Sequence, residues 1–347
     1  MYIRKIIIAI SIIIFFVMGG FSYYIYNIMF ASNTNFSEDF RYIYIKTGSD
    51  YNDLTNNLDD YIEDVSTFTV LAERKNYTNN IKPGRYIIEK GMNNNQIINS
   101  IRSNNITVNV IFNNINNLND LAGKISKHIE ADSVSFLNSF KTDFFNNKGF
   151  DKSNILSMYI PNSYNFFWNT NAEQFNERMF EEYTKFWGKN NRVEKANEIG
   201  LSKIEVMILA SIVYEESKGN IELPRIAGVY MNRLKNNWKL QADPTVKFAA
   251  YQLDQYKNTI IRRVLNKHLR IDSPYNTYKY YGLPPGIISM PSITAVDAVL
   301  NYEKHKYYFF AADPNRPGYH NFAKSLSEHK KNARLLHKDL SRRGIKK

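Results

Sequence analysis

The chain contains no cysteine among its 347 residues, so disulfide bonds and a thiolate nucleophile are excluded. No G-x-x-x-x-G-K-[ST] segment occurs, which leaves nucleotide chemistry without support. No serine lies in a G-x-S-x-G turn, so an esterase-like triad is also unsupported. His320 and His329 lack the short paired spacing of zinc ligands. We therefore expect neither a metal nor a cofactor.

Acidic residues are the scarcer charged group: 33 Asp and Glu stand against 45 Lys and Arg, which gives a net charge of +12. Such a protein suits an anionic partner, for example nucleic acid, a membrane surface or an anionic polymer. The basic residues are scattered as far as Arg342-Arg343 and Lys346-Lys347, so we expect no nucleic-acid partner. The 347 residues of the chain are enough for two or three domains. The 44% of hydrophobic residues indicates that the chain is folded.

Long hydrophobic runs are absent except at the start of the chain. Residues 6–31 carry no charge, and a membrane-spanning helix needs about 20 apolar residues. Because Arg4 and Lys5 precede the run, the positive-inside rule predicts that residues 1–5 are cytoplasmic and that the rest lies beyond the membrane. The alternative is a signal peptide cleaved near Ala31, but its apolar core usually has only about 7–15 residues.

A polar linker at 33–39 is followed by short apolar patterns, some with the two-residue period of strands and others with the spacing of helices. Strands are expected at 42–45, 85–88 and 106–112, and helices at 54–58, 62–72 and 97–101, which predicts a small α/β subdomain at 39–112. Helical patterns at 118–129, 134–140, 172–187 and 193–199 then predict a helical connecting region at 113–200. Residues 249–269 indicate helix and loop, with no assigned chemistry.

One carboxylate has an unusual place in an apolar pattern. Ser202 and Glu205 have the spacing of a capping box, which predicts a helix start. The apolar stripe of this amphipathic helix is Ile208, Leu209, Ile212 and Val213, and Glu216 falls near its middle. Burial raises the pKa of a carboxyl group, as a general acid near neutral pH requires. The alternative is that Glu216 lies in solvent, past the buried stripe, with Gly219 ending the helix.

A second amphipathic helix is expected from Pro224, and several segments around it resemble family motifs. ASIVYEE (210–216), NRL (232–234) and LQADPTV (240–246) resemble the catalytic core of the MltG-type, or YceG-like, endolytic murein transglycosylases. Further similar segments are KPGRY (82–86), YIPNSY (159–164), PYNTY (274–278), GLPPGII (282–288) and YHNF (319–322). The chain departs from the family pattern at Tyr214, often Glu, at Ala242, often Ser or Thr, and at Asn113-Asn114, often Glu-Gly.

The resemblance implies an α+β protein with a single transmembrane helix, a LysM-like subdomain and a catalytic domain at 201–345. It makes Glu216 the catalytic acid. The residues implied to bind the glycan or to support Glu216 are Gln241, Asp243, Thr245, Tyr275, Asn276, Thr277, Tyr278 and His320. Implied partners are peptidoglycan strands, the plasma membrane and peptidoglycan synthases. The LysM-like subdomain either binds glycan or acts as a spacer.

The activity implied by the resemblance is cleavage of the bond between N-acetylmuramic acid and N-acetylglucosamine within peptidoglycan strands. One carboxylate suffices there, because the C6 hydroxyl of the sugar closes a 1,6-anhydro ring and replaces water. A hydrolytic muramidase is an alternative, with Asp243 as the second carboxylate that hydrolysis needs. A membrane-tethered glycan-binding scaffold without catalysis is the other alternative.

Overall fold

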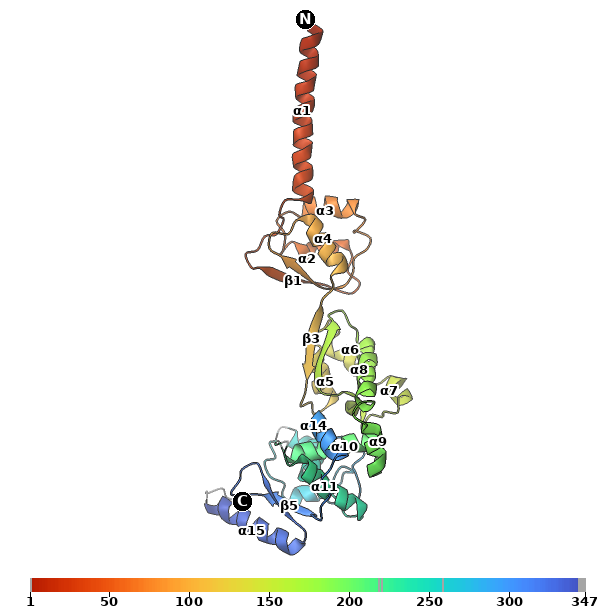
Figure 1. Cartoon of the computed structure of the whole chain (residues 1–347), viewed down its shortest axis with the longest axis vertical. Coiled ribbons are helices and arrows are strands. Elements are labelled where there is room, and N and C mark those ends of the chain that lie inside the picture. Colours follow the sequence, from red (N-terminus) through yellow and green to blue (C-terminus); the bar gives the residue numbers. More distant parts are fainter. Residues whose placement is uncertain (1, 218, 220, 258, 343–347) are drawn as a thin grey trace. The chain divides into compact units, whose positions relative to one another are not determined.

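The computed structural model describes residues 2–217, 219, 221–257 and 259–342 (Figure 1). It confirms a mixed α+β protein and divides into two compact units. The first unit comprises Met1–Val110, Ser126–Ala131 and Tyr164–Asn171. The second unit comprises Ile111–Ile125, Asp132–Ser163 and Ala172–Lys347.

The first unit begins with α1 (Tyr2–Met29), the one helix among the described residues that is long and apolar enough to cross a membrane. Its side chains are exposed except toward the end, where Ile28 is buried against α3 (Val65–Arg74) and α4 (Asn94–Ser103). The last carbonyls of a helix have no partner within the helix. The Asn94 side chain donates to the Ile28 carbonyl at 3.1 Å and satisfies one of them.

The predicted polar linker at 33–39 is not a free spacer. Asn33, Thr34 and Phe36 are buried. The Asn33 side chain donates to the side-chain oxygen of Asn94 at 2.6 Å, and Thr34 pairs with Ile62 as an isolated bridge. The end of α1 is therefore fastened to the rest of the first unit.

Two strands with two helices between them form the centre of the first unit, as the sequence predicts. β1 (Phe40–Ile45) and β2 (Gly84–Glu89) are antiparallel, with Ile43 opposite Tyr86. α2 (Tyr51–Leu58) begins at the capping residue Asp50. α3 begins three residues later than expected, because the Asp64 carboxylate caps its first amides.

β3 (Thr107–Phe112) pairs with β4 (Asn162–Phe167), a strand that the sequence analysis missed. The sequence predicts a turn within 159–164, because this segment resembles a turn motif of the family, and buried core positions for the aromatic residues Phe166 and Phe167 that follow it. In the strand, Phe166 is buried and Phe167 is half exposed, because successive side chains point to opposite faces.

The second unit contains five helices and a 3-10 turn before its central helix. These are α5 (Leu118–Ile125), α6 (Ser133–Ser139), α7 (Asp143–Asn147), η1 (Ile155–Met158), α8 (Ala172–Trp187) and α9 (Arg192–Ile199). The helix expected at 118–129 ends at residue 125. α9 ends at Gly200, whose φ of +76° is the left-handed conformation that glycine adopts without strain.

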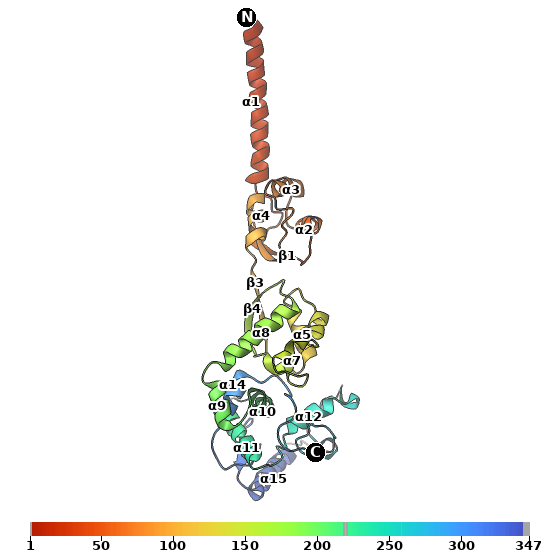
Figure 2. The same cartoon turned by 90° about the vertical axis from the view of Figure 1, so that its right-hand side faces the viewer.

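The central helix of the second unit is α10 (Lys203–Glu216). It packs against α9, α11 (Leu223–Lys235), α12 (Asp243–Tyr251) and α14 (Ile293–Leu300) (Figure 1, Figure 2). Every residue from 206 to 213 is buried. The predicted amphipathic stripe is therefore too narrow, since distant segments cover all sides of this helix.

The C-terminal part of the second unit is a hairpin covered by a helix. β5 (Phe309–Ala312) pairs with β6 (His320–Ala323), and α15 (Leu326–Arg342) packs on both strands. The region 249–269, expected as helix and loop, contains the end of α12, the turn η2 (Asp254–Tyr256) and α13 (Asn266–Leu269).

α11 lies close to the segment around Glu303 and His305. A substitution at Gly228 of α11 tests how tightly the two are packed. A Cβ atom at Gly228 would clash with the Glu303 carbonyl and lie 2.6 Å from Nε2 of His305. We expect Gly228→Ala to lower the free energy of unfolding by about 1–3 kcal/mol, measured by urea titration of the solubilised chain.

The matched control is Gly123→Ala in α5, where no heavy atom lies within 4 Å of the added Cβ. This change is expected to be neutral or stabilising by up to about 1 kcal/mol. Equal effects of the two variants would contradict the packing account.

Candidate active site

The start of α10 is set by the predicted capping box. The Glu205 amide donates to the Ser202 hydroxyl at 3.2 Å, and the Ser202 amide donates to the Glu205 carboxylate at 2.8 Å. The helix then ends at Glu216, and Ser217 is extended with a φ of −141°. The alternative end at Gly219 is wrong, because the helix stops before it.

The carboxyl group of Glu216 is partly buried and lies at the junction of α10 and α11. The buried Tyr230 of α11 donates its hydroxyl hydrogen to Oε1 of Glu216 at 2.5 Å. The pKa of Glu216 is raised to about 7. Burial is the main cause and the charge of Asp243 adds to it, whereas the Tyr230 hydrogen bond and the charges of Arg233 and Lys247 act in the opposite direction. Both protonation states are therefore accessible near neutral pH.

Arg233, one turn after Tyr230, connects three segments beside this carboxyl group. It is buried, and its Nε donates to the Tyr308 carbonyl at 2.8 Å. Its Nη1 donates to the Leu240 carbonyl. Arg233 thus holds α11 to the hairpin and to the segment that leads into α12.

Three of the predicted site residues are buried and bonded within the protein. The Thr277 hydroxyl accepts from the Ala242 amide at 3.0 Å and lies 2.8 Å from the Thr245 hydroxyl. The Asn276 side chain donates to the carbonyls of Leu269 and Ile271 at 3.0 and 2.8 Å. The Thr277 bonds fasten the loop around 276–278 to the start of α12, and the Asn276 bonds fasten it to the segment that follows α13 (Asn266–Leu269).

Four other predicted residues, Gln241, Asp243, Tyr275 and Tyr278, are more accessible. The Tyr278 hydroxyl donates to the exposed carboxylate of Asp243 at 2.6 Å, and both groups act electrostatically with Glu216. Gln241 is exposed, and its φ of +48° is left-handed. Tyr275 is half-buried and packs on Phe248, with ring centroids 4.7 Å apart.

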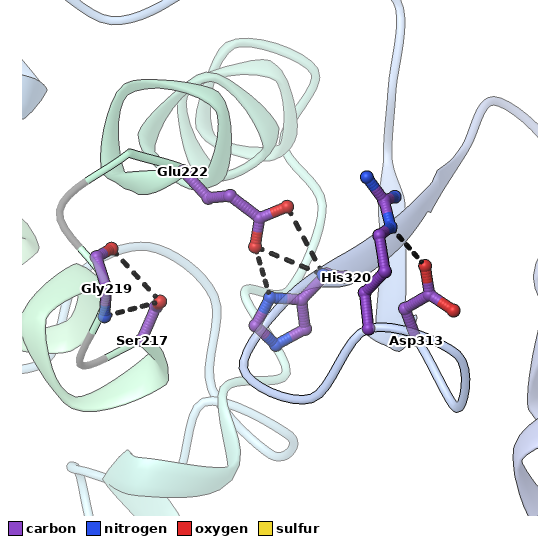
Figure 3. A network of polar contacts seen from close by, with 6 residues as sticks. Ser217, Gly219, Glu222, Asp313 and His320 are labelled. Atoms are coloured by element: carbon purple, nitrogen blue, oxygen red, sulfur yellow. Dashed lines mark hydrogen bonds and ion pairs between the residues drawn. The ribbon is translucent and has the colours of Figure 1, made fainter.

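His320 is held by a different carboxylate (Figure 3). The Glu222 carboxylate accepts from the His320 amide at 3.1 Å and lies 2.9 Å from its Nδ1. Both side chains are more than four-fifths buried. The His320 ring packs edge-on against Phe310, which packs edge-on against Tyr230. His320 is therefore linked to Glu216 through two aromatic contacts.

The sequence analysis missed the roles of Tyr230, Arg233 and Glu222. In the helix expected from Pro224, the helical spacing of residues 226, 229, 230 and 234 predicts only an apolar position for Tyr230, although a buried tyrosine hydroxyl usually needs a partner. Within the part of the chain that the structure describes, no group of three or more His, Cys, Asp or Glu residues is placed to hold a metal ion.

Comparisons with known proteins find similar sequences over most of the chain. The sequence profile of the YceG-like family matches residues 43–335. The endolytic murein transglycosylase of Bacillus subtilis (strain 168) is 34% identical over 209 residues, 58% of this chain and 55% of the relative. That of Streptococcus pneumoniae serotype 2 (strain D39) is 33% identical over 128 residues, 37% of this chain and 23% of the relative. The chain spans about half of the first relative and a quarter of the second.

A solved structure is also similar. A 2.6 Å crystal structure of a yceG-like protein from Listeria monocytogenes matches 85% of this chain and 99% of its own, with a TM-score of 0.54 and 26% identity. The similarity therefore extends over most of the fold.

The raised pKa of Glu216 predicts a dependence of stability on pH. Its pKa is about 7 in the folded chain and near the ordinary 4.5 when unfolded, so folding binds a proton between these values. The contribution is present below pH 4.5 and is lost as pH rises to 7. Relative to Glu216→Gln, the wild type should lose about 1–3 kcal/mol of unfolding free energy between pH 5 and 8, measured by urea titration.

Glu215→Gln is the control, because it removes the same formal charge one residue away. Parallel stability curves for wild type and Glu216→Gln across this pH range would show that Glu216 is not buried as described.

Proposed function

The chain belongs to the YceG-like family, and we propose that it is an endolytic lytic transglycosylase that cleaves the bond between N-acetylmuramic acid and N-acetylglucosamine in peptidoglycan strands. The observation that carries this proposal is a single partly buried carboxyl group, Glu216, with a pKa of about 7 and a tyrosine hydroxyl on one of its oxygens. Such a group is an acid in one step and a base in the next near neutral pH.

In the first step, protonated Glu216 donates its proton to the bridging oxygen. The bond from C1 of the muramic acid to that oxygen breaks, and N-acetylglucosamine leaves with a hydroxyl group. The Tyr230 hydroxyl stabilises the carboxylate that remains, because hydrogen bonds to the charged form favour it.

In the second step, the same carboxylate accepts the proton of the C6 hydroxyl group. The oxygen of that hydroxyl group bonds to C1 at the same time. A 1,6-anhydro ring forms, Glu216 is protonated again and no water is consumed. The attacking oxygen belongs to the sugar that is cleaved, so proximity replaces a second catalytic carboxylate.

The predicted site residues divide by exposure. Gln241, Asp243 and Tyr278 are accessible enough to contact the glycan. Thr245, Asn276 and Thr277 act by holding the loop in place, Tyr275 acts through its contact with Phe248, and His320 acts through Glu222 and Phe310.

The proposed location is the plasma membrane. α1 carries Arg4 and Lys5 in its first turn and no charged residue after them, which favours a cytoplasmic N-terminus. The chain after α1 would then lie on the outer side of the membrane. Peptidoglycan strands emerging from synthases would be the substrate there, and the enzyme would terminate their elongation.

A cavity in the first unit favours glycan binding over a spacer role for the LysM-like subdomain. It has a volume of about 500 Å³, and its lining includes Tyr44, Lys46 and Asn57. Tyr44 is also in edge contact with Trp168. Aromatic and amide side chains of this kind suit a sugar ring.

A hydrolytic muramidase is the second candidate, because the charge of Asp243 acts on Glu216. Hydrolysis would need Asp243 to activate water. Digestion in H₂¹⁸O separates the two reactions: transglycosylation leaves no ¹⁸O at the new end, whereas hydrolysis adds one atom per cut.

The function is tested by replacing the acid. Glu216→Gln should lower the rate of strand cleavage about 10²–10⁴-fold, since the amide can donate no proton to the bridging oxygen. Glu215→Gln, with the same loss of charge, should keep wild-type activity. Mass spectrometry of the wild-type products should show ends that lack one water relative to hydrolysis. Full activity of Glu216→Gln would refute the proposal. So would the absence of cleavage by both the wild type and Glu215→Gln.

A further inference from the structure

The second unit contains a cavity of about 1020 Å³ to which the reaction above gives no role. Its floor is apolar and is formed by buried side chains that include Phe140, Phe145, Ile155, Leu156 and Ile287. Its volume is at the upper end of the range for sites that bind small organic molecules or short peptides.

The polar part of the lining carries positive charge. Lys141 and Lys152 line the cavity, and no Asp or Glu is among its described lining residues. Both lysines are exposed, and the Lys141 ammonium group donates to the neutral side-chain oxygen of Asn138 at 3.2 Å. The nearby Asp151 carboxylate is bonded to the amide and hydroxyl of Ser153. Amide side chains, including Asn116, Asn146 and Gln252, complete the lining.

The cavity shares its walls with the Glu216 site. Phe248 lines it and belongs to α12, whose first residue is Asp243. Tyr275 packs on Phe248 and lies three residues before Tyr278, the partner of Asp243. On the other side, Tyr214 of α10 donates to Asn114, two residues before the cavity-lining Asn116. α12 and the loop that contains Tyr275 and Tyr278 therefore contribute side chains both to the cavity and to the surroundings of Glu216.

We propose that the cavity binds the stem peptide, the short peptide attached to the lactyl group of muramic acid. This inference rests on the proposed function. The N-acetylated sugars of a peptide-bearing strand are neutral, so the carboxylates of the peptide are the anions that match Lys141 and Lys152. The amide side chains match the peptide backbone, and the apolar floor matches alanine methyl groups.

Two substrates test the assignment: peptide-bearing strands, and strands from which an amidase has removed the peptides. Lys152→Glu and Lys141→Glu should each lower the ratio of kcat/KM for peptide-bearing over stripped strands about tenfold, mainly through KM. Lys189→Glu is the matched control, since Lys189 is exposed and lies outside the cavity lining. It makes the same change of charge and should leave the ratio at the wild-type value.

Binding provides a readout that does not depend on cleavage. An alanyl-isoglutamyl-lysyl-alanine peptide should bind full-length Glu216→Gln in calorimetry, and its fully amidated form should bind at least tenfold more weakly. Adding Lys152→Glu should abolish the difference.

Equal binding of the two peptides, an equal ratio in Lys152→Glu and Lys189→Glu, or tighter binding of stripped strands would overturn the stem-peptide assignment. If the wild type cleaves neither strand, the proposed function fails, but the calorimetry still decides what the cavity binds.

Discussion

The contact between the Glu216 carboxyl group and the buried Tyr230 hydroxyl is the interaction on which the rest of this site depends. It requires α10 to end beside α11, with its last residue still covered. The C-terminal end of a helix carries the negative pole of the helix dipole. This pole disfavours the charged form of a carboxyl group, as burial also does. Helix position and burial thus both favour a protonated Glu216 near neutral pH, while Tyr230 keeps the charged form reachable.

The surrounding structure fixes that contact from distant parts of the chain. The Ser211 hydroxyl of α10 accepts from the Ile288 amide at 3.2 Å, and Arg233 joins α11 to residues on either side. Glu222, just before α11, holds His320 of β6 (Figure 3). The site is therefore assembled by residues that lie up to about one hundred positions apart in the sequence. The loop at 276–278 packs against the start of α12 beside it.

Local signals in the sequence predicted most of the helices and strands, but not which other parts of the chain surround them. The Ser202–Glu205 capping box set the start of α10, and helical periodicity placed Glu216 on the inward side, as the structure confirms. The complete burial of residues 206–213 could not be predicted, because it depends on how four other helices, α9, α11, α12 and α14, pack around α10. The strand β4 resembled a turn, since its first residues are Asn and Ser and its partner β3 lies 50 residues earlier. The helical period predicts that Tyr230 lies on a buried face, but it does not predict which group its hydroxyl contacts. From the sequence, Tyr230 is therefore interpreted only as a core residue.

The measurement that most directly tests the account is the pH dependence of kcat/KM for wild type and Tyr230→Phe on purified peptidoglycan strands. The account predicts that the wild-type rate falls above an apparent pKa of about 7, as Glu216 loses its proton. Because the Tyr230 hydrogen bond lowers that pKa, Tyr230→Phe should move the fall to higher pH. A rate that stays level from pH 5 to 9, or a fall at the same pH in both proteins, would contradict it.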